Sequence, residues 1–267
     1  MKFFSYRDRP VHRGPYPVEQ LVRSTVQPDI SKLDELRQLE MVDGDDPHSI
    51  SRAMDDYLSL LDSVRAGPVT YAAAEIPDDP QERSDHLKAA GYFLDSSMVG
   101  ICRLGPELSL SNAFNHPKID QWLLQGESNK IHLRLNVSAI YKRMEHSTTS
   151  GSDEINSHTH AIVFLQEFPR DPTQNEPGAD WITGMQQQRA SLRAGETASV
   201  MALYLRTLGF EARAHSATSS DIDLNKAAVA AGLGIIDSDS KVSNPFVGRR
   251  FGLSVVTTNL ELKPDMP

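Results

Sequence analysis

Apolar residues recur at steps of three and four between positions 50 and 64, with most of the acids on the other side of the spiral. This spacing predicts an amphipathic helix, which ends before Gly67. The apolar stripe of this helix consists of Ile50, Met54, Tyr57, Leu58, Leu61 and Val64. The other side carries Asp55, Asp56 and Asp62.

A second amphipathic pattern runs from position 182 to 208 and predicts a long helix. Gly209 follows it and can take the left-handed conformation that closes a helix. Two shorter helices are predicted at 80–90, closed by Gly91, and at 223–231.

Strands are predicted where apolar residues alternate with polar ones or form a short continuous run. Alternation indicates a strand at 131–140, and an apolar run indicates a buried strand at 160–168. The remaining strand regions are 92–104, 210–215 and a terminal pair at 242–246 and 251–257. Helices and strands alternate without the regular spacing of parallel βαβ units, so we predict an α+β sandwich rather than a doubly wound sheet.

The first 40 residues combine four prolines with charged residues and only brief apolar patches. This composition favours an extended arm laid over a domain, with Tyr6, Tyr16 and Leu21 as candidate anchors. We therefore divide the chain into an N-terminal arm and helix, residues 1–65, and one domain, residues 66–267.

The chain has 267 residues and is 39% hydrophobic, which is enough to build a substantial core. Its formal net charge is −9 and it has no Lys/Arg-rich tract, so nucleic acid is not an expected partner. The N-terminus lacks the features of a secretory signal, and no apolar stretch approaches the roughly 20 residues that span a bilayer. We expect a soluble cytoplasmic protein without a membrane partner.

Cys102 is the only cysteine of the chain. One thiol excludes an intramolecular disulfide, a zinc ribbon and an all-thiolate iron–sulfur cluster, which needs about four thiolates. Because Cys102 lies among Val99, Ile101 and Leu104, we interpret it as a buried small apolar residue rather than a nucleophile.

Two neighbouring runs carry the most specific pattern in the chain. The first is GFEARAHS at 209–216, and the second is DLNKAAVAAGLG at 223–234. With the long helix before them and the strand after them, they resemble the cobalamin-binding core of the reductive dehalogenase and epoxyqueuosine reductase group. The resemblance starts near Ala89, where the pattern AAGxxLxxxMVGI resembles the beginning of such a domain.

The resemblance implies a nitroreductase-like fold in which the segment after the Gly-Leu-Gly loop lies against the corrin and the nucleotide tail of cobalamin. Glycines there permit positive φ and a close approach of the backbone to a large ligand. The cofactor contacts implied by the resemblance are His215, Ser216, Asn225, Gly232, Leu233 and Gly234.

Each implied contact also has a structural interpretation. His215 can be a strand-end histidine that is hydrogen-bonded to the backbone. Asn225 can be a polar residue in the first turn of a helix that starts at Asp223, and the Gly-Leu-Gly loop can simply stop that helix.

The chain departs from the family pattern at two places. After Gly234, the family usually has an aromatic residue, a glycine and a basic residue, whereas this chain has IIDSDS at 235–240. The carboxylates of that run would oppose a phosphate-bearing tail. At the C-terminus, the family continues into ferredoxin-like cysteine motifs, whereas this sequence ends at Pro267.

One explanation unites both departures. Some cytoplasmic dehalogenases of this group carry two copies of the module, and this chain resembles the first copy, which has lost its cofactor. The family's catalytic set belongs to the second copy, so we carry none of it onto Tyr141, Lys142, Arg143 or Tyr204.

Two pairs of basic residues invite a ligand as well as a structural interpretation. His158 and His160 would share one face of a strand and could grip a metal, but no third ligand is identifiable. Arg249 and Arg250 could hold an anionic ligand or a partner carboxylate, and a turn between two strands explains them equally well.

The acidic pairs are interpreted as solvated. Asp55 and Asp56 are assigned to a helix face, and Asp221 and Asp223 to a helix start.

Three functions remain in view. The first is a non-catalytic N-terminal module of a cytoplasmic reductive dehalogenase, binding neither cobalamin nor an iron–sulfur cluster itself. It would support the catalytic cobalamin and iron–sulfur half or a separate redox partner, and it predicts a sizeable exposed apolar face. The second is a free-standing cobalamin- or flavin-binding reductase domain reduced by a partner protein, with a deep pocket bordered by His215, Asn225 and Gly232. The third is a plain flavin reductase, for which no phosphate-binding segment is found near the N-terminus.

Overall fold

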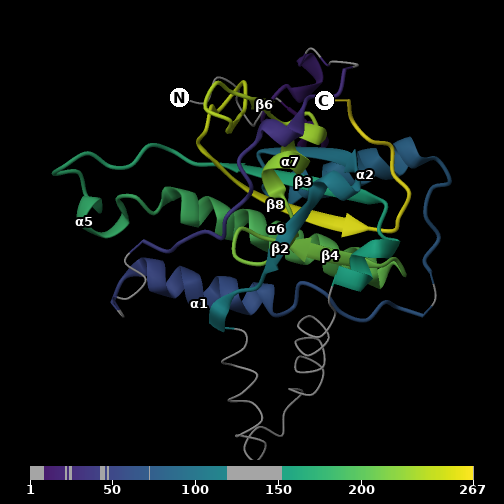
Figure 1. The fold of residues 1–267 in the computed structure, drawn as a ribbon, viewed down its shortest axis with the longest axis horizontal. Helices are drawn as coiled ribbons and strands as arrows, with labels where there is room; N and C mark the ends of the chain where they lie inside the picture. The colour runs from purple at the N-terminus through teal and green to yellow at the C-terminus, as the bar shows by residue number, and fades with distance from the viewer. Residues whose placement is uncertain are drawn as a thin grey trace, which may run out of the picture.

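The structure is a computed structural model that describes residues 9–118 and 152–266, apart from positions 22, 24, 25, 43–45, 47 and 72. Its centre is a four-stranded antiparallel sheet with the strand order β1-β3-β8-β4 (Figure 1). The strands are β1 (Met98–Arg103), β3 (His160–Glu167), β8 (Phe251–Thr258) and β4 (Ala212–His215). The fold is therefore α+β, as the sequence predicts.

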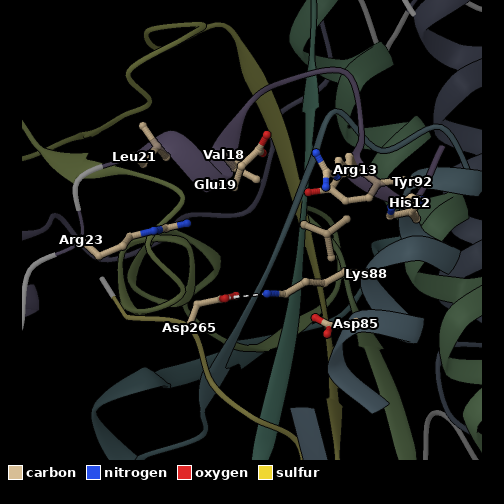
Figure 2. Close-up of a pocket in the computed structure, with 11 residues that line it drawn as sticks. His12, Arg13, Val18, Glu19, Leu21, Arg23, Asp85, Lys88, Tyr92 and Asp265 are labelled. Atoms are coloured by element: carbon tan, nitrogen blue, oxygen red, sulfur yellow. Dashed lines mark hydrogen bonds and ion pairs between the residues drawn. The ribbon is translucent and has the colours of Figure 1, made fainter. Parts of the chain in front are cut away.

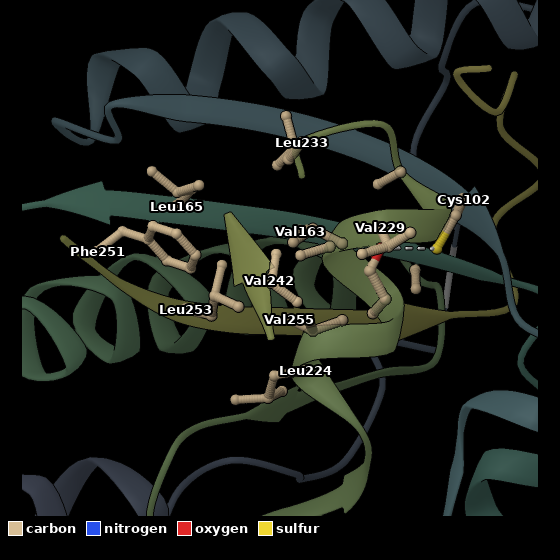
Figure 3. Packing of buried hydrophobic residues seen from close by; sticks show 14 of the residues in the cluster. Cys102, Val163, Leu165, Leu224, Val229, Leu233, Val242, Phe251, Leu253 and Val255 are labelled. Carbon is tan, nitrogen blue, oxygen red and sulfur yellow. Dashed lines mark hydrogen bonds between the residues drawn. The ribbon is translucent and has the colours of Figure 1, made fainter. Parts of the chain in front are cut away.

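Helices cover both faces of the sheet. On one face, α6 (Gln186–Thr207) and α2 (Pro80–Phe93) pack against Phe164 and Val256. On the other face, α7 (Leu224–Ala230) packs against Val163 and Val255 (Figure 3). Because successive side chains point to opposite faces, strands buried on both sides carry continuous apolar runs.

Helix α1 (Ile50–Asp62) lies along α6 as an outer layer (Figure 1). It starts where the Ser49 side chain accepts a hydrogen bond from the Arg52 backbone N–H at 3.1 Å. Helix α6 ends at Thr207, and the φ of +94° at Gly209 confirms the predicted stop.

Two small ribbons accompany the main sheet. The first pairs β2 (Ser109–Phe114) with β5 (Ser220–Ile222), and the second pairs β6 (Ile235–Ile236) with β7 (Val242–Ser243). A short helix α5 (Ala179–Ile182) precedes α6. The remaining short elements are 3-10 turns at Val11–Arg13, Val18–Gln20, Ile30–Lys32, Pro106–Leu108 and Ser152–Ser157. Among the described residues, no helix combines the length and apolar character needed to cross a bilayer.

The described N-terminal residues form an extended arm over the α7 face. Leu33 is buried in the core on that face, and the ring centroid of Tyr16 lies 5.4 Å from that of Phe246, with the two rings tilted by 40°. Backbone hydrogen bonding continues the contact, since the Leu39 N–H donates to the Ala217 carbonyl at 2.8 Å. The candidate anchor Tyr6 lies outside the described residues, and the division at residue 65 stays a prediction.

Several predicted elements need correction. Gly91 does not close α2, which continues to Phe93; an added Cβ at Gly91 would lie 2.8 Å from Val99, so glycine permits close packing there. The long helix starts at Gln186 rather than 182, because Gly184, with a φ of +81°, interrupts the helical conformation.

The terminal strands also pair differently from the prediction. β7 pairs with β6, whereas β8 enters the main sheet between β3 and β4. The strand predicted at 131–140 lies outside the described residues.

Candidate functional site

Two of the predicted contacts, His215 and Ser216, follow one another at the end of β4. His215 belongs to a buried polar cluster, each member of which is at most 7% exposed. We define this cluster by Asp62, Arg65, Arg213, His215, Asp221 and Thr257. It lies where α1, β4, β5 and β8 meet.

The His215 ring is fixed by hydrogen bonds on both nitrogens. Nδ1 accepts from the Asp221 backbone N–H at 3.3 Å, so Nε2 carries the proton and donates to Thr257 Oγ1 at 2.9 Å. Thr257 in turn donates to Nδ1 of His158 at 2.8 Å. Burial lowers the pKa of His215 well below its usual value; the Asp221 charge opposes this lowering, and the charges of Arg65 and Arg213 add to it. The imidazole is therefore neutral and its polar atoms are engaged.

Asp221 is the carboxylate that balances two buried arginines. Its Oδ2 accepts hydrogen bonds from Arg213 Nε at 2.7 Å and from Arg65 Nη1 at 3.0 Å. Burial alone would raise the pKa of Asp221, but the charges of Arg65 and Arg213 and the hydrogen bond from Arg213 hold this pKa below its usual value. The predicted solvated acid is thus wrong for Asp221, since its charge is needed inside the protein.

Ser216 binds a second buried acid. Its hydroxyl donates to Asp62 Oδ1 at 2.7 Å, and the Thr218 hydroxyl donates to Oδ2. Burial raises the pKa of Asp62, while the two hydroxyls and the charges of His116 and Arg65 lower it in part. Ser216 therefore ties β4 to α1.

Asn225 lies in the first turn of α7, as its structural interpretation predicts. The Asp223 carboxylate caps this helix and accepts from the backbone N–H groups of Asn225 at 2.9 Å and Lys226 at 3.1 Å. Its second oxygen accepts from the Leu36 N–H at 3.0 Å, which fastens the arm to α7. Asp223 is fully buried, so the prediction of a solvated acid is wrong here too.

The Gly-Leu-Gly loop lies at the other end of α7. Gly232 has a φ of +66°, and an added Cβ would lie 2.0 Å from the Arg23 guanidinium. At Gly234 an added Cβ would lie 2.4 Å from Val242. Leu233 is buried in the core beside α7 (Figure 3). The space beside both glycines is thus filled by this chain itself.

The acidic run after the loop is neutralised within the chain. Arg249 Nε donates to Asp237 Oδ2 at 2.7 Å, and Arg249 Nη2 donates to Asp239 Oδ2 at 2.5 Å. Asp237 also accepts from two backbone N–H groups of its own turn. The first arginine of the predicted anion pair therefore serves the β6–β7 hairpin.

Two cavities lie between the arm, α2 and the C-terminal tail. One, of about 530 Å³, is lined by charged groups that include Arg13, Glu19 and Lys88 (Figure 2). The other, of about 710 Å³, includes Arg103 and Lys263, and both share Arg23 and Asp265. None of the six predicted contacts lines either cavity.

The two histidines of the candidate metal pair contact different threonines. His158 bonds Thr257, while His160 Nδ1 lies 2.9 Å from Thr159 Oγ1. Cys102 is buried, and burial raises the pKa of its thiol to about 12, which suits the predicted inert residue. Within residues 9–118 and 152–266, no group of three His, Cys, Asp or Glu residues could hold a metal ion.

Sequence reasoning missed most of the buried polar cluster. Arg65 and Arg213 carry no local signal of burial, because an arginine is usually exposed unless it is paired. Asp55 was placed on a solvated face, but it is buried and binds His116 Nε2 at 2.8 Å. The alternation within β4, where Arg213 and His215 occupy every second position, is the one signal that could have indicated a polar face.

Comparison with solved structures follows the resemblance noted in the sequence. The catabolic reductive dehalogenase NpRdhA is 34% identical to this chain and covers all of it, with a TM-score of 0.71. The chain is similar to part of a reductive dehalogenase over its whole length. A complex of the same dehalogenase with 3-bromo-4-hydroxybenzoic acid matches with the same identity and TM-score. The chain spans about a third of the length of these dehalogenases, 32% and 31% respectively.

Other comparisons add little. An epoxyqueuosine reductase covers 68% of this chain, and the chain covers 47% of it, at 10% identity and a TM-score of 0.43. These values are too low to carry an argument. No family model matches the chain, and a search of curated proteins found no relative.

The described residues do not fit a corrin in this conformation. The ring of His215 is fully buried, and its two nitrogens are occupied. Arg23 and Val242 fill the space that the loop glycines would offer to a flat ligand. A cofactor could therefore reach His215, Gly232 and Gly234 only if these groups moved, and all six residues remain predicted contacts.

Proposed function

We propose that this chain is a supporting, non-catalytic module of a reductive dehalogenase. It would work beside the polypeptide that carries cobalamin and the iron–sulfur clusters, either joined to it or as a separate chain. Its relation to one third of a reductive dehalogenase supports the family, and the filled space beside Gly232 and Gly234 supports the lack of cofactor chemistry.

The cysteine content of the chain supports the same proposal. Reductive cobalamin chemistry needs an electron relay close to the metal, and iron–sulfur relays are held by thiolates. This chain has one thiol, Cys102, which is buried and protonated. The electrons would therefore have to pass through another polypeptide.

The proposal includes a fold and a location. We assign the α+β sandwich to the nitroreductase-like class, on the strength of the sequence resemblance and the sheet covered on both faces. We also place the protein in the cytoplasm, as its sequence predicts.

A binding experiment tests this function. Purified chain is incubated with hydroxocobalamin and, separately, with flavin mononucleotide, then passed through a desalting column. We expect the visible bands to remain unshifted and the cofactor to separate from the protein. Retained, shifted bands would instead support the free-standing cobalamin- or flavin-binding domain.

A turnover experiment is the second test of the proposed function. The chain is mixed with hydroxocobalamin, a chemical reductant and 3-bromo-4-hydroxybenzoic acid, which a related dehalogenase binds. That dehalogenase serves as the positive control. Bromide release by this chain above the rate with free cobalamin would overturn a supporting function.

A further inference from the structure

Helix α1 buries mostly polar residues beside Leu58 and exposes part of its apolar stripe. The buried residues of the helix are Ser51, Asp55, Leu58, Ser59 and Asp62. Residues of the apolar stripe are exposed instead: Ile50 is 48% exposed and Tyr57 is 43% exposed, and the neighbouring Leu60 is 43% exposed. An amphipathic helix of a self-contained domain shows the opposite arrangement.

Specific polar bonds fix this orientation. Ser51 Oγ donates to Gln188 Oε1 at 2.7 Å, and Asp55 binds His116 at 2.8 Å. Asp62 accepts from Ser216 and Thr218. Turning the helix to bury its apolar stripe would break all of these bonds and leave buried polar groups unsatisfied, so the exposed stripe belongs to the native fold.

Exposed apolar residues also lie on the neighbouring helix α6. Helices α1 and α6 lie side by side from Ser51, which binds Gln188, to Val64, whose carbonyl accepts from Arg206 Nη2 at 3.2 Å (Figure 1). On the outer side of α6, three large residues are between 42% and 49% exposed. We define the α1–α6 patch by the residues Ile50, Met54, Tyr57, Leu60, Leu61, Val200, Leu203 and Tyr204.

A small cavity lies at one end of the patch. It has a volume of about 280 Å³ and is lined by Ile50 and Met54 of α1 together with Ile182, Met185 and other residues of the α5–α6 region. A hollow of this kind can receive one apolar side chain of a partner, which is how binding energy concentrates in many interfaces. The patch thus offers both an apolar surface and an anchor point.

We infer that the α1–α6 patch docks the remaining part of a reductive dehalogenase, the polypeptide with the cobalamin site and the cluster cysteines. This inference rests on the proposed function. The similar dehalogenases match this chain over its full length. About two thirds of each dehalogenase chain has no counterpart in this sequence. Exposed apolar residues that gather on two neighbouring helices favour a protein–protein interface. The additional polypeptide supplies a protein surface to cover it.

The experiment uses the full chain and, as the probe, the cobalamin- and cluster-bearing reductive dehalogenase polypeptide of the same organism, purified separately. Biolayer interferometry gives the Kd for wild type, Leu60→Lys and Val200→Lys. Phe93→Lys is the matched control, because Phe93 is 74% exposed at the end of α2 and lies outside the patch. Melting temperatures check that each exposed substitution leaves the fold intact.

We expect wild type to bind, each patch variant to raise the Kd at least tenfold, and Phe93→Lys to stay within twofold. We also expect slower amide exchange in α1 when the probe is bound. If wild type binds but the patch variants bind equally well, the docking surface is wrong and the proposed function survives. If wild type does not bind the probe at all, the proposed function and the docking surface both fail.

Two further outcomes would assign the patch to another occupant. Sedimentation of the chain alone could reveal a dimer that Leu60→Lys dissociates, in which case a second copy covers the patch. Exchange in α1 could be as slow in the isolated monomer as with the probe, in which case another part of this chain covers it. Either result overturns the inference.

Discussion

Arg213 donates a hydrogen bond from Nε to Oδ2 of Asp221 at 2.7 Å, and both side chains are buried. The pair fixes the end of β4 against β5. Arg65 shares the same carboxylate oxygen at 3.0 Å, so one acid balances two guanidinium groups inside the protein. A buried charge without its partner is costly, and this makes Asp221 the centre of the polar cluster.

We predict that Asp221→Asn lowers the free energy of unfolding by about 3 to 5 kcal/mol, because it removes the carboxylate charge that binds two buried guanidinium groups. Urea denaturation followed by circular dichroism measures this loss. Asp239→Asn is the matched control, since Asp239 pairs with Arg249 at the exposed hairpin and its loss should leave the midpoint almost unchanged. Equal, small shifts for both variants would contradict a structural need for the Asp221 charge.

We predict that His215 makes the protein less stable as the pH falls below about 6.5. Burial lowers its pKa in the folded state, so the unfolded state binds more protons in this range and stability decreases towards acid. One such proton changes the free energy of unfolding by about 1.4 kcal/mol per pH unit. Denaturation curves recorded between pH 7 and 5 give the free energy of unfolding at each pH. This free energy should depend less steeply on pH for His215→Gln than for wild type.

The exposed His86, whose side chain is 68% exposed, provides the control for this measurement. His86→Gln should follow the pH dependence of wild type. If His215→Gln also keeps the wild-type slope, the ring is not held neutral by its surroundings.

The long helices could be predicted because their signals are local. Apolar residues at helical spacing and a following glycine lie within one segment, and both α1 and α6 are predicted from these signals. The short ribbons were missed or mispaired for the opposite reason. β6 and β7 have two residues each, and β2 pairs with β5 in an irregular register. None of these three strands therefore shows a usable alternation of apolar and polar residues.

The buried polar cluster could not be derived from sequence patterns. Arg65, Arg213 and Asp221 each match the statistics of surface residues, and only the fold brings them together. The same limit applies to α1. Periodicity correctly located its apolar stripe, but no local signal tells whether a stripe faces the protein's own core or another surface.

We predict that Asp223→Ala destabilises the protein by about 1 kcal/mol and also loosens the arm. The carboxylate caps α7 and holds the Leu36 backbone, so both contacts are lost together. Asp79→Ala is the matched control, because Asp79 caps α2 through Gln81. Limited proteolysis should cut the arm near Leu36 faster in Asp223→Ala only, and equal cleavage in both variants would contradict the arm contact.

We predict that Gly91→Ala destabilises the protein although alanine favours a helix interior by about 1 kcal/mol over glycine. An added Cβ would lie 2.8 Å from Val99 and 2.9 Å from Phe164, and overpacking of this kind costs about 1 to 3 kcal/mol. Thermal and urea denaturation measure the balance. In a Val99→Ala background the clash with Val99 disappears, so the cost of Gly91→Ala should fall by at least half, as a double-mutant cycle reports. A stabilised Gly91→Ala variant would instead mean that α2 does not approach β1 as closely as the structure indicates.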